Sequence, residues 1–101
     1  MALDSKLRRQ LRTRVDAPIR VCWQDRLGQD KYAMVHSYDI SSTGIRLTMP
    51  EAVAVRTVVV LQSGSLRLHG SASVRYCTRA TGRYVVGVEF VGGMQWQPPP
   101  V

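Results

Sequence analysis

Two short groups of polar residues have the composition of a ligand-binding site. One is the Asp39-Ile40-Ser41-Ser42-Thr43-Gly44 segment near the middle of the chain, and the other is a run of arginines close to the N-terminus: Arg8, Arg9, Arg12 and Arg14. The planar guanidinium fork of arginine fits phosphate oxygens and the acceptor edge of guanine. A carboxylate accepts hydrogen bonds from N–H donors, and a serine hydroxyl both donates and accepts. These residue types favour a ligand that carries phosphate or a nucleobase.

The central segment has the pattern of a turn between two strands. Asp39 and Ser41 are two residues apart, so we expect their side chains to project from the same side of the backbone as it enters the turn. Gly44 permits a positive φ or the close approach of a ligand. A purely structural turn is the alternative, because Asp and Ser also hydrogen-bond to their own backbone in turns. In the ligand-binding interpretation Asp39 belongs to the outward-facing set of its strand.

Composition and charge narrow the function classes. The chain has a formal net charge of +7 and a pI near 10.3, and only Lys6 and Lys31 of its 14 cationic residues are lysines. This arginine bias favours a phosphate-bearing partner. The sequence has no Gly-x-Ser-x-Gly, Walker or His-Glu-x-x-His motif, and its acidic residues are few and scattered, so we expect neither catalysis nor a cofactor. Its two cysteines and two histidines lack metal-ligand spacing, so we expect no metal site.

The rest of the sequence predicts strands. Hydrophobic and polar residues alternate, or β-branched residues run on, in six segments: 18–24, 32–40, 45–49, 57–62, 66–76 and 84–90. An antiparallel barrel or sandwich is the economical arrangement, because closure removes exposed sheet edges. Trp23 and the four tyrosines fall mostly on apolar strand faces, which predicts that they pack in the core. We expect a basic arm at 1–15, a barrel at 16–92 and a proline-rich tail at 93–101.

The ends of the chain carry no targeting pattern that we recognise. The longest apolar run is far shorter than the roughly 20 residues of a membrane span, and the N-terminal stretch lacks the apolar core of a secretory signal. We therefore expect a cytoplasmic protein without membrane insertion.

Taken together, the arginine run and the Asp-x-Ser-x-x-Gly turn resemble the two-part signature of the PilZ family. The segment Val86-Gly87-Val88-Glu89-Phe90 also looks like the final strand of that family. The resemblance covers about residues 8–92. It implies an all-β, six-stranded antiparallel split β-barrel that binds cyclic di-GMP on its outer face, clamped by the N-terminal arginines and the turn. The implied ligand-binding residues are Arg8, Arg9, Arg12, Arg14, Asp39, Ser41 and Gly44, with Arg46 as a supporting cation.

The resemblance leaves the register of the arginines open. Arg8 and Arg12 have the family spacing, whereas Arg14 stands at the usual place of the second arginine, directly before the lead-in to the first strand. Either the arm holds a two-residue insertion, or Arg14 takes the second role together with Arg9. Some family members bind an intercalated ligand dimer, and the sequence does not distinguish that from a monomer.

Two other functions compete with this interpretation. Some PilZ domains lack the arginine motif and dock protein partners, so an interaction module that does not bind cyclic di-GMP is the alternative. A basic DNA- or RNA-binding barrel is disfavoured, because the strands lack clustered exposed aromatic residues for stacking bases. For the cyclic di-GMP receptor we expect an arm that becomes ordered on binding and thereby switches a protein partner or a neighbouring domain.

Overall fold

The computed structural model describes residues 12–97. This part of the chain is built of β-strands joined by turns and loops. The strands are β1 (Thr13–Arg14), β2 (Pro18–Gln24), β3 (Asp30–Ile40), β4 (Gly44–Met49), β5 (Val58–Ser63), β6 (Leu68–Ala80) and β7 (Arg83–Phe90). Six of them correspond to the predicted segments, although the predicted strand 66–76 begins two residues later and continues to Ala80. Thr13–Arg14 is an extra short strand inside the predicted arm.

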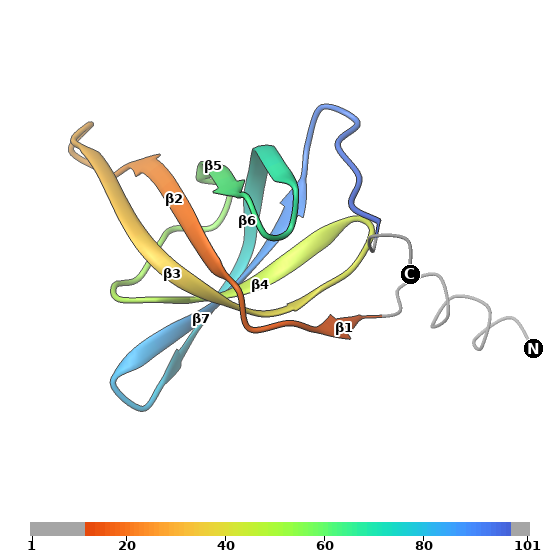
Figure 1. The fold of residues 1–101 in the computed structure, drawn as a ribbon. Helices are drawn as coiled ribbons and strands as arrows, with labels where there is room; N and C mark the ends of the chain where they lie inside the picture. Colours follow the sequence, from red (N-terminus) through yellow and green to blue (C-terminus); the bar gives the residue numbers. More distant parts are fainter. Residues whose placement is uncertain (1–11, 98–101) are drawn as a thin grey trace, which may run out of the picture.

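The six long strands close into an antiparallel barrel (Figure 1). Neighbours follow the order β3-β2-β5-β6-β7-β4, and pairing of β4 with β3 completes the circle. The predicted all-β, six-stranded antiparallel barrel is therefore confirmed. The additional β1 pairs with the C-terminal end of β3, next to the turn that leads into β4.

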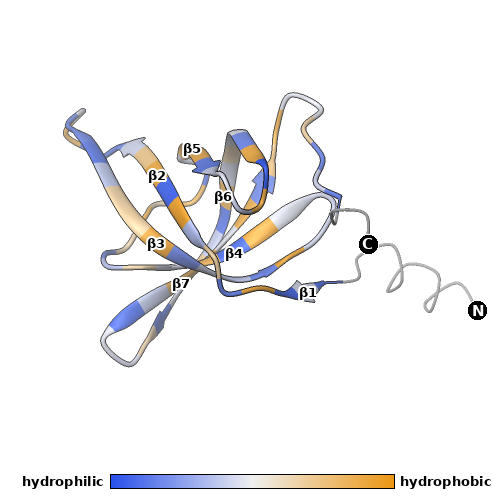
Figure 2. Ribbon diagram, viewed as in Figure 1, coloured by the Kyte–Doolittle hydropathy of each residue, from blue (hydrophilic) through white to orange (hydrophobic). Residues whose placement is uncertain are grey.

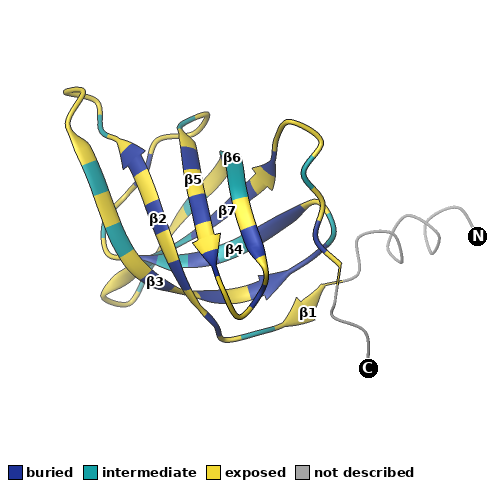
Figure 3. Cartoon of the chain, turned by 45° about the horizontal axis from the view of Figure 1, so that its top comes forward, coloured by how far each residue is buried: buried dark blue, intermediate teal, exposed yellow. Residues whose placement is uncertain are grey.

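Apolar side chains from alternating positions fill the barrel. In β2, Ile19, Val21 and Trp23 are buried and the residues between them are exposed, as the sequence predicts. The same alternation is visible along the neighbouring strands in hydropathy (Figure 2) and in burial (Figure 3). Burying one such side chain contributes about 1.5–3 kcal/mol to folding. The barrel is thus a packed core, and its outer face is what remains for binding.

The β2–β3 hairpin ends in a turn that contains Gly28. Gly28 has φ +78°, and its N–H donates to the Asp25 carbonyl at 3.0 Å. The Asp25 carboxylate accepts bonds from the N–H groups of Leu27 and Gln29, both at 2.9 Å. An aspartate that bonds to the following backbone and a glycine in the left-handed region are the usual components of such a turn.

Most of the tyrosines do not pack in the core, so the prediction for them was wrong. Tyr32, Tyr38 and Tyr76 are exposed to 80%, 38% and 39%, and Tyr84 is the one of the four that is partly buried against the core. Trp23 is buried as expected. In β3 the inward positions hold the smaller Val35 and Ser37. The larger residues at the alternate positions, such as Met34 and Tyr38, therefore face outward.

A β-bulge in β3 explains why strict alternation fails there. Ser37 lies opposite Leu47 of β4, but Asp39 lies opposite Arg46, so Tyr38 is an extra residue without its own partner. A bulge shifts the following side chain to the other face of the sheet. Asp39 therefore leaves the inward set of Val35 and Ser37 and shares the outer face with Arg46.

The C-terminal segment packs on the barrel beside the β3–β4 turn. Trp96 is buried, its indole N–H donates to the Leu66 carbonyl at 3.0 Å, and its backbone N–H donates to the Ser42 carbonyl at 3.1 Å. Figure 1 shows this segment running from the end of β7 back toward the turn. The turn is therefore held from outside as well as by its own strands.

Candidate functional site

The N-terminal segment reaches the central turn because β3 holds it in two ways. In β1, Thr13 lies opposite Ile40 and Arg14 opposite Asp39. Further along, the buried Ser37 hydroxyl donates to the Val15 carbonyl and accepts from the Ala17 N–H. These contacts fix the backbone on both sides of Arg14 and bring Arg12 and Arg14 to the outer face beside the turn.

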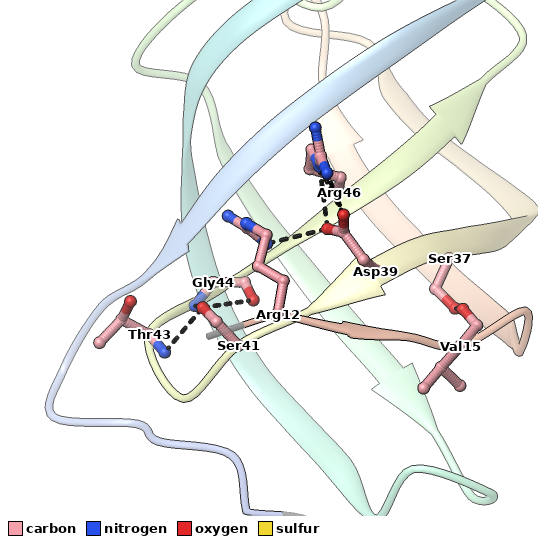
Figure 4. A network of polar contacts seen from close by, with 8 residues as sticks. All are labelled: Arg12, Val15, Ser37, Asp39, Ser41, Thr43, Gly44 and Arg46. Atoms are coloured by element: carbon pink, nitrogen blue, oxygen red, sulfur yellow. Dashed lines mark hydrogen bonds and ion pairs between the residues drawn. The ribbon is translucent and has the colours of Figure 1, made fainter. Parts of the chain in front are cut away.

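Asp39 forms the centre of a buried ion-pair network (Figure 4). Its Oδ1 accepts from the Arg12 guanidinium at 3.0 Å, and Arg46 Nε lies 2.9 Å from both carboxylate oxygens. Arg46 Nη2 also donates to Oδ2, which makes the second pair two-pronged. The Asp39 side chain is only 4% exposed, whereas each arginine side chain is 35% exposed. Asp39 thus faces outward, as expected, but lies underneath the two arginines that cover it.

This arrangement keeps the carboxylate charged. Burial alone would raise the pKa of Asp39, but the hydrogen bond from Arg46 and the positive charges of Arg12 and Arg46 outweigh burial, and the pKa falls below its ordinary value. The hydrogen bond to Asp39 correspondingly raises the pKa of Arg46. The network is a fixed anion flanked by two cations with partly exposed side chains.

Tyr38, the bulge residue, lies close to two guanidinium groups. The guanidinium carbon of Arg14 is 5.0 Å from the centre of the Tyr38 ring, and that of Arg46 is 5.1 Å away. Both distances are within the range of cation–π attraction. The ring therefore helps to hold Arg14 and Arg46 at the surface. Arg14, Tyr38 and Arg83 also line an open hollow of about 620 Å³ that adjoins the network.

Ser41 and Gly44 build the turn that carries Asp39. The Ser41 side chain is buried, and its hydroxyl accepts from the N–H groups of Thr43 at 3.3 Å and Gly44 at 3.2 Å. A Cβ at position 44 would lie 2.5 Å from the Val88 carbonyl oxygen of β7, and Gly44 is not among the residues with positive φ. Gly44 therefore does not have the positive φ that a glycine permits, and it is required here because β7 approaches closely.

The structure describes six of the eight expected site residues, and these form two groups. Arg12, Arg14, Asp39 and Arg46 come together on the outer face, and Ser41 and Gly44 lie within the supporting turn. Arg8 and Arg9 lie outside the described residues. Arg12 contacts the carboxylate, whereas Arg14 contacts the aromatic ring, so the two described arginines of the run have different partners.

A comparison with protein-family models decides the family. The model of the PilZ domain matches residues 6–95, which is nearly the whole chain. The chain belongs to the PilZ family. PilZ domains typically bind cyclic di-GMP and are generally non-catalytic receptor domains. A comparison with curated protein sequences gave no significant match.

Two residues of this PilZ site were not expected from the sequence. Tyr38 was assigned to the core because apolar residues stand at even positions of its strand, but the inward positions before the bulge are the odd ones, Val35 and Ser37. Ser37 clamps the segment between β1 and β2, and its signal was a polar residue in the same alternating set as Val35.

Within residues 12–97, none of the structure forms a helix long and apolar enough to cross a membrane.

Proposed function

We propose that this PilZ domain is a cytoplasmic receptor that binds cyclic di-GMP on the outer face formed by β1, β3 and β4. The observation that carries the proposal is the buried Asp39 carboxylate covered by Arg12 and Arg46. Guanine offers N1–H and N2–H donors to a carboxylate and N7 and O6 acceptors to a guanidinium. One site with both groups therefore complements one guanine, and the remaining arginines complement the phosphates.

Binding requires a redistribution of hydrogen bonds, because both carboxylate oxygens are already occupied. Arg12 makes a single contact to Oδ1, whereas Arg46 makes three contacts to the two oxygens. Arg12 is thus the easier partner to displace. In the proposed mechanism guanine replaces Arg12 on Asp39, and the freed guanidinium moves to a ligand phosphate. This exchange changes the position of Arg12 beside β1, which gives a partner or neighbouring domain a signal to read.

Calorimetric titration of the full chain with cyclic di-GMP tests the proposal. We expect affinity in the micromolar range or tighter, and little affinity for cyclic di-AMP or GTP. Adenine lacks the N1–H and N2–H donors that Asp39 requires, and GTP has one guanine in place of two. A flat cyclic di-GMP titration with folded protein would contradict the receptor function.

An interaction module without ligand binding is the second candidate. The outer face of β2, β3 and β5 favours it, since Tyr32, Val58 and Val60 are exposed there beside Cys22 and line an open hollow of about 970 Å³. An exposed cluster of large apolar side chains is typical of protein-interaction surfaces. A flat titration, together with unchanged amide shifts around Asp39, would favour this second function.

A further inference from the structure

The outer face carries a second aromatic residue that lies at the same level as Asp39, three strands away. Reading across the sheet, Asp39 of β3 is opposite Arg46 of β4, Arg46 is opposite Gly87 of β7, and Gly87 is opposite Tyr76 of β6. Directly opposite residues in antiparallel strands share one face of the sheet. With strands about 4.8 Å apart, the row from Asp39 to Tyr76 spans about 14 Å.

Tyr76 reaches this face through a bulge of its own. Val74 of β6 pairs with Val88 and Tyr76 pairs with Gly87, so Arg75 is an extra residue between them. Val74 is buried inside the barrel, whereas Tyr76 is 39% exposed. The bulge in β3 turns Asp39 outward, and the bulge in β6 does the same for Tyr76. The two irregular strands thus flank the regular pair of β4 and β7.

The Tyr76 ring packs directly on Gly87. A Cβ at position 87 would lie 2.2 Å from Cε2, 2.5 Å from Cζ and 2.8 Å from Cδ2 of that ring. Gly87 stands between the inward-facing Val86 and Val88, yet it is itself buried, because the ring covers it. The ring therefore lies back across β7 toward β4. Because Arg46 lies directly opposite Gly87, the ring on Gly87 is next to the strand position of the arginine that holds Asp39.

We propose that Tyr76 is a further ligand-contacting residue, whose ring stacks on a purine base and extends the site from β3 and β4 to β6. This inference rests on the proposed function and names a contact that the arginine run and the central turn do not supply. An aromatic ring fixed on a glycine loses little entropy when a base stacks on it, because its position is already restricted. Next to Arg46, the ring offers one apolar surface and one cation to the same base.

The test compares two substitutions of Tyr76 with a matched substitution of Tyr32 of β3, the most exposed tyrosine, which lines the hollow shared with β2 and β5. Tyr76→Leu keeps an apolar side chain over Gly87 but removes the aromatic face, and Tyr76→Phe keeps the ring without the hydroxyl. Stacking of a base on an aromatic side chain corresponds to about 5- to 150-fold in affinity. We expect Tyr76→Leu to weaken cyclic di-GMP binding within this range, while Tyr76→Phe and Tyr32→Leu change it less than about 3-fold.

Two further measurements separate stacking from support of Arg46. The ring current of Tyr76 should shift a purine H8 resonance upfield in the wild-type and Tyr76→Phe complexes, and this shift should be absent with Tyr76→Leu. Gly87→Ala displaces the ring and should weaken binding, but it should add little to Tyr76→Leu because both changes act on one interaction. Circular dichroism and thermal melting of each variant verify the fold.

The outcomes are distinct. If the wild type binds and Tyr76→Leu binds equally well, the inference about Tyr76 is wrong and the receptor function stands. If Tyr76→Phe loses as much affinity as Tyr76→Leu, the hydroxyl acts through Arg46 and stacking is refuted. If the wild type does not bind cyclic di-GMP, both proposals fall.

Discussion

Asp39 and Arg46 face each other across β3 and β4, and the guanidinium Nε of Arg46 lies 2.9 Å from both oxygens of a carboxylate that is almost completely buried. The pair exists because the bulge at Tyr38 moves Asp39 out of the inward set of its strand. A charge covered to this extent is stable only while its partners remain. The proposed binding and the fold therefore depend on the same side chain.

Asp39→Asn should weaken both functions of this residue. We expect a loss in cyclic di-GMP binding of about 1.5–3 kcal/mol, the range for a hydrogen bond with a charged partner. We also expect a loss of about 1–3 kcal/mol in the free energy of unfolding, since Arg12 and Arg46 lose a charged acceptor. Although Asp39 faces outward, its side chain is buried beneath the two arginines, so its substitution affects the fold as well as binding. Calorimetry and urea unfolding measure the two effects, and unchanged stability would show that the network contributes little to folding.

Stability should fall in acid through the titration of Asp39. Its pKa is lower in the folded protein than its ordinary value of 3.8. The unfolded chain therefore binds the proton at higher pH than the folded chain does. The stabilisation by charged Asp39 is complete above the ordinary pKa and is lost as the pH falls through the folded pKa.

Urea unfolding of the wild type and Asp39→Asn between about pH 2 and 7 measures this contribution as a difference. Comparing the two proteins cancels the titration of the other carboxylates. We expect a constant difference near neutral pH that shrinks below about pH 4. A difference that is independent of pH would mean that the Asp39 charge is not coupled to folding.

Substitutions of the two turn residues should destabilise the fold to different extents. Gly44→Ala places a Cβ 2.5 Å from the Val88 carbonyl, which is backbone and cannot move without disturbing the β4–β7 pairing. We expect a loss of more than about 2 kcal/mol in unfolding free energy, typical of overpacking. Ser41→Ala removes only the hydroxyl that accepts from the Thr43 and Gly44 N–H groups, so a loss of about 1 kcal/mol is expected.

Thermal unfolding of the two turn variants provides the measurement. Gly64→Ala is a suitable control, because no atom lies within 4 Å of a Cβ built there and the glycine does not have positive φ. A melting temperature for Gly44→Ala as high as that of the control would contradict the steric argument.

The sequence predicted the barrel well because hydrophobic alternation reports directly on which face of a strand is buried. Through the PilZ resemblance it also predicted that the arginine run and the turn belong together, but it left open which of the arginines bind. The two bulges were not predictable, since a bulge inserts one residue without changing composition, and its position depends on pairing with a distant strand. The outward positions of Asp39 and Tyr76 follow from those bulges. The role of Gly44 was equally hidden, because its neighbour Val88 is far away in sequence.

Substitutions of Arg12 and Arg14 should weaken binding alike but change the stability in acid differently, although the two residues are only two positions apart. Arg12 donates to the Asp39 carboxylate and its charge helps to lower the pKa of that group. Arg14 lies over the Tyr38 ring. We expect Arg12→Gln and Arg14→Gln each to weaken cyclic di-GMP binding by about 5- to 100-fold, because each removes a cation from a site for a dianionic ligand. Each should also reduce the salt dependence of binding, since fewer ionic contacts remain to be screened.

The acid unfolding profile distinguishes the two variants. Arg12→Gln should shift the acid limb that is due to Asp39 to higher pH, because the carboxylate keeps only Arg46 as a cationic partner. Arg14→Gln should leave that limb unchanged, since Arg14 does not contribute to the lowered pKa. If both variants bind weakly and Arg12→Gln alone shifts the profile, Arg12 is the arginine exchanged between Asp39 and the ligand. If Arg12→Gln instead binds with wild-type affinity, Arg14 is the arginine that binds the phosphate. The register of the arginine run is then the one in which Arg14 takes the second role.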